Sequence, residues 1–240
     1  MSYASVLAFG DSTTAGCELL DTVDWEETKK LSFPNQLAGM LGVPCYNYAW
    51  PGGSNDRSLR LLPEALLMHP NSLVLFTYTS FDRSEFFTED PELPQSPDGY
   101  SGLGGCWLKV KSINKHQKLN TAYLRDFYTD TDPYNRYKAY NMMLGVQLLC
   151  KQYASNFVQI FLYNRLLLPP VYQDLIFKEL DPAHIHQFDF SQKGIEWEYN
   201  NEGYGSLNHW ANMKGYSFCP GGHIGQDAHN NFAKRLYNKL

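Results

Sequence analysis

Short, continuous apolar runs alternate along the chain with longer segments in which apolar residues recur every three or four positions. A run that is apolar at every position is typical of a strand buried on both faces of a parallel sheet. The clearest run is SLVLFTY at residues 72–78, and SVLAF at residues 5–9 is similar. We predict strands over residues 5–9, 43–49, 72–78, 157–162 and 185–190.

Helical spacing predicts helices over residues 33–41, 55–69, 134–154 and 226–240, and one more that ends near residue 179. Pro63 falls inside the second of these helices and favours a kink or break there. Prolines and a glycine cluster mark the stretch from about 83 to 133, which predicts a long insertion with short elements. Strands that alternate with helices indicate an α/β fold. We expect one domain over residues 1–240, a three-layer α/β/α sandwich around a parallel sheet of about five strands.

Three polar or glycine-rich segments follow predicted strand ends, at residues 10–12, 51–53 and 79–82. In a parallel α/β sheet, loops at the carboxyl ends of the strands meet at one edge and form the ligand site. We therefore expect these three loops to come together in one crevice.

Composition narrows the classes of partner. The chain has 20 Lys and Arg against 25 Asp and Glu, a net charge of -5, which disfavours nucleic acid. The five cysteines include no CxxC pair, so the sequence indicates neither a disulfide framework nor a zinc knuckle. No apolar run reaches the length of a membrane span, and no export signal precedes the first strand. We expect a soluble protein, cytoplasmic or virion-associated, that binds no membrane.

Ser12 is the first candidate for chemistry, because it lies where the first predicted strand turns into the next element. A serine hydroxyl needs a base and oxyanion donors before it acts as a nucleophile. An equally ordinary interpretation is that Ser12 or Thr13 caps a helix.

A wider pattern resembles the SGNH, or GDSL-like, hydrolase family. Residues 8–16 (AFGDSTTAG) resemble the first block of that family, and residues 47–54 (NYAWPGGS) resemble its second block. His223 stands just before the last predicted helix, where the family keeps its general base. The resemblance implies a flavodoxin-like sheet, Ser12 as the nucleophile, His223 as the base and the Gly52 N–H as an oxyanion donor. The chain is also similar to uncharacterised bacteriophage-encoded members of the family.

Two positions depart from the family pattern. The third block usually carries an asparagine whose amide is an oxyanion donor, and Phe81 stands at that position here. The Thr79 or Ser80 hydroxyl or the Asn55 amide could replace it. The family also places an aspartate three residues before the histidine, where this chain has Pro220.

Without that aspartate, the working hypothesis is a Ser12–His223 dyad whose imidazole is held by a backbone carbonyl. Asp227 and Asp189 are the two candidates for an orienting acid, although an acid at a helix start also explains Asp227. His229 lies inside the last predicted helix and is interpreted as a packing or surface residue.

A metal site is the alternative enzyme chemistry. His184 and His186 would share one face of a strand, and His209 could join them, but no carboxylate or thiol at a recognisable spacing completes a site. We therefore expect no metal and no cofactor.

The resemblance implies a serine esterase that removes an acyl group, with O-acetyl as the expected group, from a carbohydrate or another small molecule. The chain has 17 Tyr, 14 Phe and 5 Trp, and Trp107, Trp197 and Trp210 are candidates to stack on a sugar. Two alternatives remain: an acyltransferase that uses the same nucleophile, and a catalytically impaired SGNH-fold module that binds glycans.

Overall fold

A parallel sheet of five strands forms the centre of the molecule. The computed structural model describes residues 2–21, 24–79, 83–88, 106–111, 133–154, 156–162, 181–186 and 206–240. The strand order in the sheet is β2-β1-β3-β6-β7, and every neighbouring pair is parallel. The strands are β1 (Val6–Phe9), β2 (Cys45–Asn47), β3 (Leu73–Tyr78), β6 (Asn156–Phe161) and β7 (Ile185–His186). This confirms the predicted α/β fold, with β2 shorter than expected and with residues 187–190 outside the described part.

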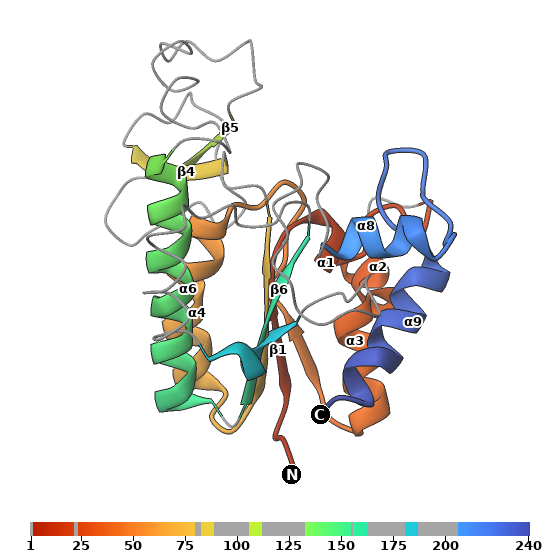
Figure 1. The fold of residues 1–240 in the computed structure, drawn as a ribbon, viewed down its shortest axis with the longest axis horizontal. Helices are drawn as coiled ribbons and strands as arrows, with labels where there is room; N and C mark the ends of the chain where they lie inside the picture. The colour runs from red at the N-terminus through yellow and green to blue at the C-terminus, as the bar shows by residue number, and fades with distance from the viewer. Residues whose placement is uncertain are drawn as a thin grey trace.

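Helices cover both faces of the sheet (Figure 1). On one side lie α4 (Asn55–Met68) and α6 (Pro133–Tyr153), and on the other lie α3 (Phe33–Leu41) and α9 (Gln226–Tyr237). Pro63 is accommodated within α4, so the helix is not divided there. Three short helices that the periodicity did not predict complete the described part: α1 (Ser12–Ala15), α2 (Trp25–Leu31) and α8 (Leu207–Met213). The helix predicted to end near residue 179 lies outside the described residues.

The two core layers follow from the alternation of side chains along each strand. In β1, Val6 and Ala8 face the layer that contains Phe232 of α9, whereas Leu7 and Phe9 face the opposite layer. All four β1 side chains are fully buried. The continuous apolar run in the sequence therefore reflects a strand with helices on both faces.

An antiparallel pair, β4 (Arg83–Thr88) and β5 (Cys106–Lys111), lies above the sheet (Figure 1). Charged contacts join β4 to the helices below it. The Glu85 carboxylate lies 3.0 Å from Nη2 of Arg60 in α4. Asp56 accepts hydrogen bonds from Lys138 Nζ at 2.7 Å and from the Glu85 N–H at 3.3 Å. These contacts hold β4 at the carboxyl end of the sheet.

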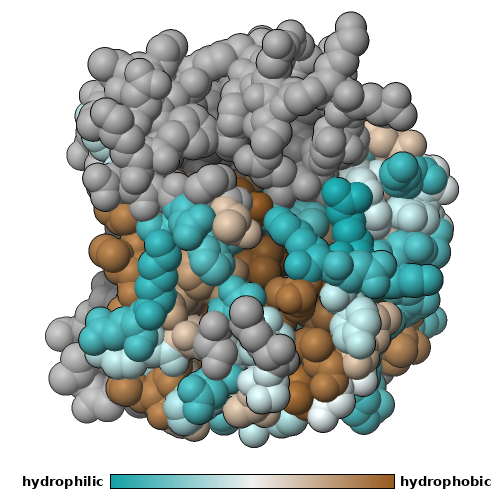
Figure 2. Space-filling model, turned by 60° about the horizontal axis from the view of Figure 1, so that its bottom comes forward, coloured by the Kyte–Doolittle hydropathy of each residue, from teal (hydrophilic) through white to brown (hydrophobic). Residues whose placement is uncertain are grey.

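The side of the molecule near the amino ends of the strands shows separate groups of apolar residues among polar ones (Figure 2). Exposed large apolar side chains include Leu67 on α4 and Leu148 on α6. Scattered exposure of this kind is ordinary for a protein surface. None of the described helices has the length and apolar character that crossing a bilayer requires.

Candidate active site

The nucleophile turn, which we define as residues 10–16, follows β1 at the carboxyl end of the sheet. Ser12 is the first residue of α1, and the cap of that helix is Asp11, whose Oδ1 accepts the Thr13 N–H at 3.1 Å. A side chain at Gly10 would not fit, because its Cβ would lie 2.4 Å from Thr14 Oγ1. The turn ends at Gly16, whose left-handed φ of 78° closes the helix.

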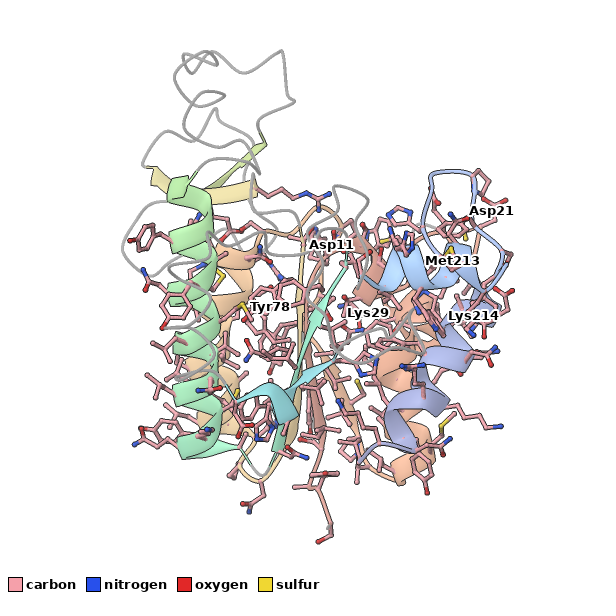
Figure 3. All side chains as sticks on the ribbon, viewed as in Figure 1. Asp11, Asp21, Lys29, Tyr78, Met213 and Lys214 are labelled. Carbon is pink, nitrogen blue, oxygen red and sulfur yellow. The ribbon has the colours of Figure 1, made fainter. Side chains whose placement is uncertain are left out.

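Asp11 anchors this turn to two other elements. Its side chain is completely buried and lies at the upper end of the sheet (Figure 3). Besides the Thr13 N–H, its carboxylate accepts a hydrogen bond from Thr79 Oγ1 at 2.7 Å and pairs with Arg83 Nη1 at 2.8 Å. The backbone that carries Ser12 is therefore held by residues that follow β3 and begin β4. Arg83 was not among the residues singled out from the sequence.

The loop after β2 runs beside the nucleophile turn. The Tyr48 N–H donates to Ala8 O at 2.8 Å, and the Trp50 N–H donates to Gly10 O at 3.3 Å. A Cβ on Gly53 would lie 3.1 Å from the same Gly10 oxygen, so the two backbones approach closely. Gly52 has a left-handed φ of 66°, which suits glycine at this tight turn. The structure thus brings the Gly52 loop to Ser12, as predicted from the strand ends.

His223 reaches Ser12 from the histidine loop, which we define as residues 217–225, just before α9. Phe218 and Ile224 form an antiparallel bridge, and the Cys219 N–H donates to His223 O at 2.8 Å, so the loop folds back on itself. His223 Nε2 lies 2.8 Å from Ser12 Oγ. The nucleophile and base suggested by the resemblance are therefore in hydrogen-bond contact although 211 positions separate them.

Glu18 occupies the other side of the His223 ring. Its Oε2 lies 3.0 Å from His223 Nδ1, and the same oxygen accepts the Gly221 N–H at 2.9 Å. The ring N–H and the carboxylate are close but not well aligned, because Nδ1 makes no hydrogen bond of strict geometry to any described residue. The close contact with the His223 ring lowers the pKa of Glu18 below its ordinary value. No sequence pattern pointed to Glu18, because its contact with His223 depends on two loops that are distant in sequence.

Asp227, one of the two carboxylates proposed from the sequence as orienting acids, has a different partner. Asp227 accepts hydrogen bonds from the Ser217 N–H at 3.0 Å and from Ser217 Oγ at 2.7 Å, so it braces the base of the histidine loop. Asp189 lies outside the described residues. The carboxylate beside His223 is instead that of Glu18.

Two of the three proposed substitutes for the missing amide donor, Asn55 and Thr79, are engaged in structural contacts. Asn55 Oδ1 accepts the Thr79 N–H at 2.9 Å, and Asn55 Nδ2 donates to Thr79 O at 3.0 Å. The side chain of Asn55 therefore pairs with the backbone just after β3, much as a neighbouring strand would. The Thr79 hydroxyl donates to Asp11. Ser80 and Phe81 lie outside the described residues.

Three other histidines, His229, His186 and His184, are buried or packed against other side chains. His229 is buried in α9, where its Nδ1 accepts the Phe33 N–H at 3.0 Å. Burial lowers the pKa of His229 to about 3, and it lowers the pKa of His186 to about 3 as well. His184 stacks on Phe157 with ring centroids 3.9 Å apart. In the part of the chain that the structure describes, no three histidine, cysteine or acidic side chains converge as metal ligands do.

Among the tryptophans, Trp210 is packed in the core against Tyr216 and Phe232. Its predicted role in sugar stacking is therefore wrong, because its ring has no free face at the surface. The Trp197 residue and the Trp107 side chain lie outside the described part. Trp25 and Trp50, which were not predicted, lie with ring centroids 6.4 Å apart beside the nucleophile turn.

Known proteins resemble this chain in topology but hardly in sequence. No protein-family model matches the sequence, and no curated protein sequence is significantly similar to it. A carbohydrate esterase family 2 enzyme from Corynascus thermopiles (Myceliophthora fergusii) aligns with 98% of this chain at 14% identity and a TM-score of 0.47. An acetyl xylan esterase from Butyrivibrio proteoclasticus aligns with all of it at 13% identity and a TM-score of 0.47. The chain spans 64% of the length of each of these two structures.

A member of the lipolytic protein G-D-S-L family from Veillonella parvula is similar over 98% of this chain and 99% of its own, at 11% identity and a TM-score of 0.48. None of these three structures is described as a bacteriophage protein. With TM-scores below 0.5, these similarities carry no argument about activity, which depends on the geometry of the site. The chain is structurally similar, at low identity, to carbohydrate esterases and G-D-S-L lipolytic proteins.

Proposed function

We propose that this protein is a serine esterase that cleaves an acyl ester through an acyl-enzyme on Ser12. The 2.8 Å contact between Ser12 Oγ and His223 Nε2 carries this proposal. Its distance suits proton transfer from a serine to a general base. Both side chains lie at the carboxyl ends of the strands, where α/β folds bind their ligands.

The reaction has two halves. Ser12 Oγ attacks the ester carbonyl while His223 Nε2 takes the hydroxyl proton, and His223 then returns that proton to the departing alcohol. In the second half, His223 deprotonates a water molecule that attacks the acyl-enzyme. The carboxylic acid leaves, and Ser12 recovers its proton from His223.

The oxyanion that forms in each half needs hydrogen-bond donors. The Ser12 N–H is at the start of α1, where an N–H has no acceptor within the helix. The Gly52 N–H comes from the loop that pairs with Gly10. We assign these two donors to the oxyanion. Removing one such donor typically costs about 3 kcal/mol of transition-state stabilisation.

For the substrate, we infer an O-acetyl or similarly small acyl group on a carbohydrate. Trp25 and Trp50 support this choice, since both aromatic rings lie beside the nucleophile turn and are only partly buried. The Trp50 ring also receives the Lys29 ammonium at 5.8 Å from its centroid. Aromatic faces of this kind pack well against the C–H faces of sugars.

The test is hydrolysis of p-nitrophenyl acetate by the wild type, Ser12→Ala and His223→Ala. We expect either substitution to lower kcat by about 10³-fold or more. Ser2→Ala and His69→Ala are matched controls, because both residues lie away from Ser12, and they should retain wild-type kcat. Mass spectrometry should find a fluorophosphonate adduct on Ser12 in the wild type.

Equal, slow hydrolysis by the wild type and Ser12→Ala, without an adduct, would rule out the esterase. In that case, binding of acetylated oligosaccharides by both proteins would indicate a glycan-binding module. An acyltransferase would form the adduct but would transfer acetyl to an added sugar faster than to water, and product analysis separates the two.

A further inference from the structure

Among the described residues, Glu18 supplies the carboxylate that contacts His223. We propose that Glu18 is a positioning residue that orients the His223 imidazole, in place of the aspartate that is missing at position 220. This inference rests on the proposed esterase function and gives the dyad a third member. The Glu18 carboxylate lies 3.0 Å from Nδ1, while Nε2 on the far side of the ring lies 2.8 Å from Ser12 Oγ.

Gly221 fits the presence of this carboxylate. Its N–H donates to Glu18 Oε2 at 2.9 Å. A Cβ on Gly221 would lie 1.9 Å from Glu18 Oε1 and 2.7 Å from Glu18 Cδ, so an alanine there and the observed Glu18 side chain exclude each other. The same loop that brings His223 to Ser12 therefore leaves room for Glu18 and binds it.

The backbone of Glu18 is also unusual. Its φ of 68° is left-handed, a conformation that is unfavourable for a residue with a side chain. The thiol of Cys219 donates to the Glu18 carbonyl at 3.5 Å, which ties this backbone to the histidine loop. A glycine would adopt this backbone conformation more easily, so the side chain of Glu18, and not its backbone, explains a glutamate here.

Among the described residues, Glu18 is the charged group that contacts the His223 ring. Burial raises the pKa of Cys17 to about 12, and desolvation raises that of Cys219, so both nearby thiols stay neutral at pH 7. His229 is also neutral, since burial lowers its pKa to about 3. Asp11 is paired with Arg83, and Asp227 is bound to Ser217. The lowered pKa of Glu18 keeps its carboxylate ionised at the same pH.

Two effects on the reaction follow. A carboxylate at Nδ1 favours the tautomer with the proton on Nδ1, which leaves the Nε2 lone pair free to accept the Ser12 proton. It also stabilises the imidazolium that forms when that proton arrives. The Glu18 side chain is 35% exposed, so water screens part of the effect, and we expect less than a fully buried aspartate provides.

The first test compares Glu18→Gln with the wild type on p-nitrophenyl acetate. We expect kcat to fall about 10- to 100-fold with little change in KM, because the lost charge acts on the transition state. The acid limb of the kcat/KM profile should also move to lower pH. Glu27→Gln is the matched control, since Glu27 pairs with Lys30 on the exposed face of α2. Wild-type kcat in Glu18→Gln overturns the inference.

A mutant cycle tests the contact itself. Gly221→Ala should lower kcat in the wild-type background by displacing the carboxylate. In the Glu18→Ala background, where that carboxylate is gone, Gly221→Ala should change kcat less than about 2-fold. If the kcat loss of the double variant equals the product of the losses of the two single variants, the proposed contact is contradicted. Thermal unfolding of each variant shows whether it is folded under the assay conditions.

A measurement that needs no activity separates this inference from the esterase proposal. Nitrogen-15 NMR of the neutral His223 ring should show mainly the Nδ1–H tautomer in the wild type. Glu18→Ala should shift the ring toward the Nε2–H tautomer, which the neutral side chain of a solvated histidine prefers. An unchanged tautomer ratio overturns the role of Glu18 even if Ser12 proves to be the nucleophile. If the tautomer ratio shifts as predicted but the wild type is inactive, Glu18 still orients the His223 ring, and only the esterase proposal is refuted.

Discussion

The nucleophile turn (residues 10–16) and the histidine loop (residues 217–225) meet at one contact but are held in opposite ways. In the turn, Asp11, Thr13 and Thr14 are fully buried, and Asp11 receives hydrogen bonds or an ion pair from three partners. In the loop, residues 220–222 are exposed. The core thus positions the nucleophile, whereas an exposed loop positions the base. Substitutions in the turn should cost stability, and substitutions around the loop should cost activity.

The largest expected effect is on Asp11. Asp11→Ala removes the buried partner of Arg83 and Thr79, and breaking a buried ion pair typically costs about 3–5 kcal/mol. We expect the free energy of unfolding, measured with urea, to fall by at least about 3 kcal/mol. Glu27→Ala, on the exposed face of α2, should change it by less than about 0.5 kcal/mol. A loss below about 1 kcal/mol for Asp11→Ala would remove the contrast between the turn and the loop.

Asn55 gives the next effect. Asn55→Ala leaves the N–H and carbonyl of Thr79 without their side-chain partner in a buried position. Unsatisfied buried groups of this kind cost about 1–3 kcal/mol, so we expect a loss of about 2 kcal/mol in urea unfolding. The same variant separates two roles for the amide. If kcat also falls about 10²-fold where the protein is fully folded, Asn55 is an oxyanion donor as well.

His223 and His229 differ in burial, and this difference predicts how the stability of the protein depends on pH. His223 is at the surface, but His229 in α9 is buried, and desolvation first, then the nearby His223, lower its pKa from 6.5 to about 3. Between these values the unfolded chain binds a proton that the native state does not. Stability should therefore decrease as pH falls from about 6.5 toward 3, by about 1.4 kcal/mol per pH unit for this residue.

His229→Gln tests this slope, because glutamine keeps a polar side chain at this position but does not titrate. Urea unfolding between pH 4 and 7 should show a slope reduced by about 1.4 kcal/mol per pH unit. His186 has the same lowered pKa and should retain its own contribution. His69→Gln, at the carboxyl end of α4, is the control and should leave the slope unchanged. An unaltered slope in His229→Gln would mean that His229 is already protonated in the native state.

The same difference between turn and loop explains what the sequence could reveal. Strands such as β3 and the helix α3 were predictable because their apolar pattern reflects burial on known faces, and α3 has the predicted bounds. Ser12 and the loop of Gly52 follow from strand ends that a parallel sheet must bring together. Trp210 was misjudged because α8 has only seven residues, too few to show which face is buried.

Glu18 could not be predicted, because its role depends on a left-handed backbone and on a loop about 200 positions away. The sequence showed only that the usual aspartate was missing at position 220. Asn55 was recognised as a possible donor, but its pairing with the Thr79 backbone depends on the geometry after β3. Side chains that act across loops of different origin leave no periodic signal, in contrast to those that face a core.

The smallest expected effect is that of Glu18→Gly, which should raise the stability of the protein and lower its activity. Glycine adopts a left-handed φ without strain, although it also adds freedom to the unfolded chain, so Glu18→Gly should raise the free energy of unfolding by about 0.5 kcal/mol. The same change removes the carboxylate from His223 and should lower kcat. Asn71→Gly is the matched control, because Asn71 has a φ of 60° in the turn before β3, at the opposite end of the sheet from Ser12.

We expect Asn71→Gly to stabilise the protein slightly less, since asparagine tolerates this conformation better than glutamate does, and to leave kcat unchanged. Urea unfolding and p-nitrophenyl acetate hydrolysis on the same preparations measure both quantities. If Glu18→Gly is more stable than the wild type and has the same kcat, a glutamate at this left-handed position does not assist His223. If it is less stable and less active, the Glu18 side chain holds the histidine loop in place, and the loop depends on the turn for its structure as well as for its chemistry.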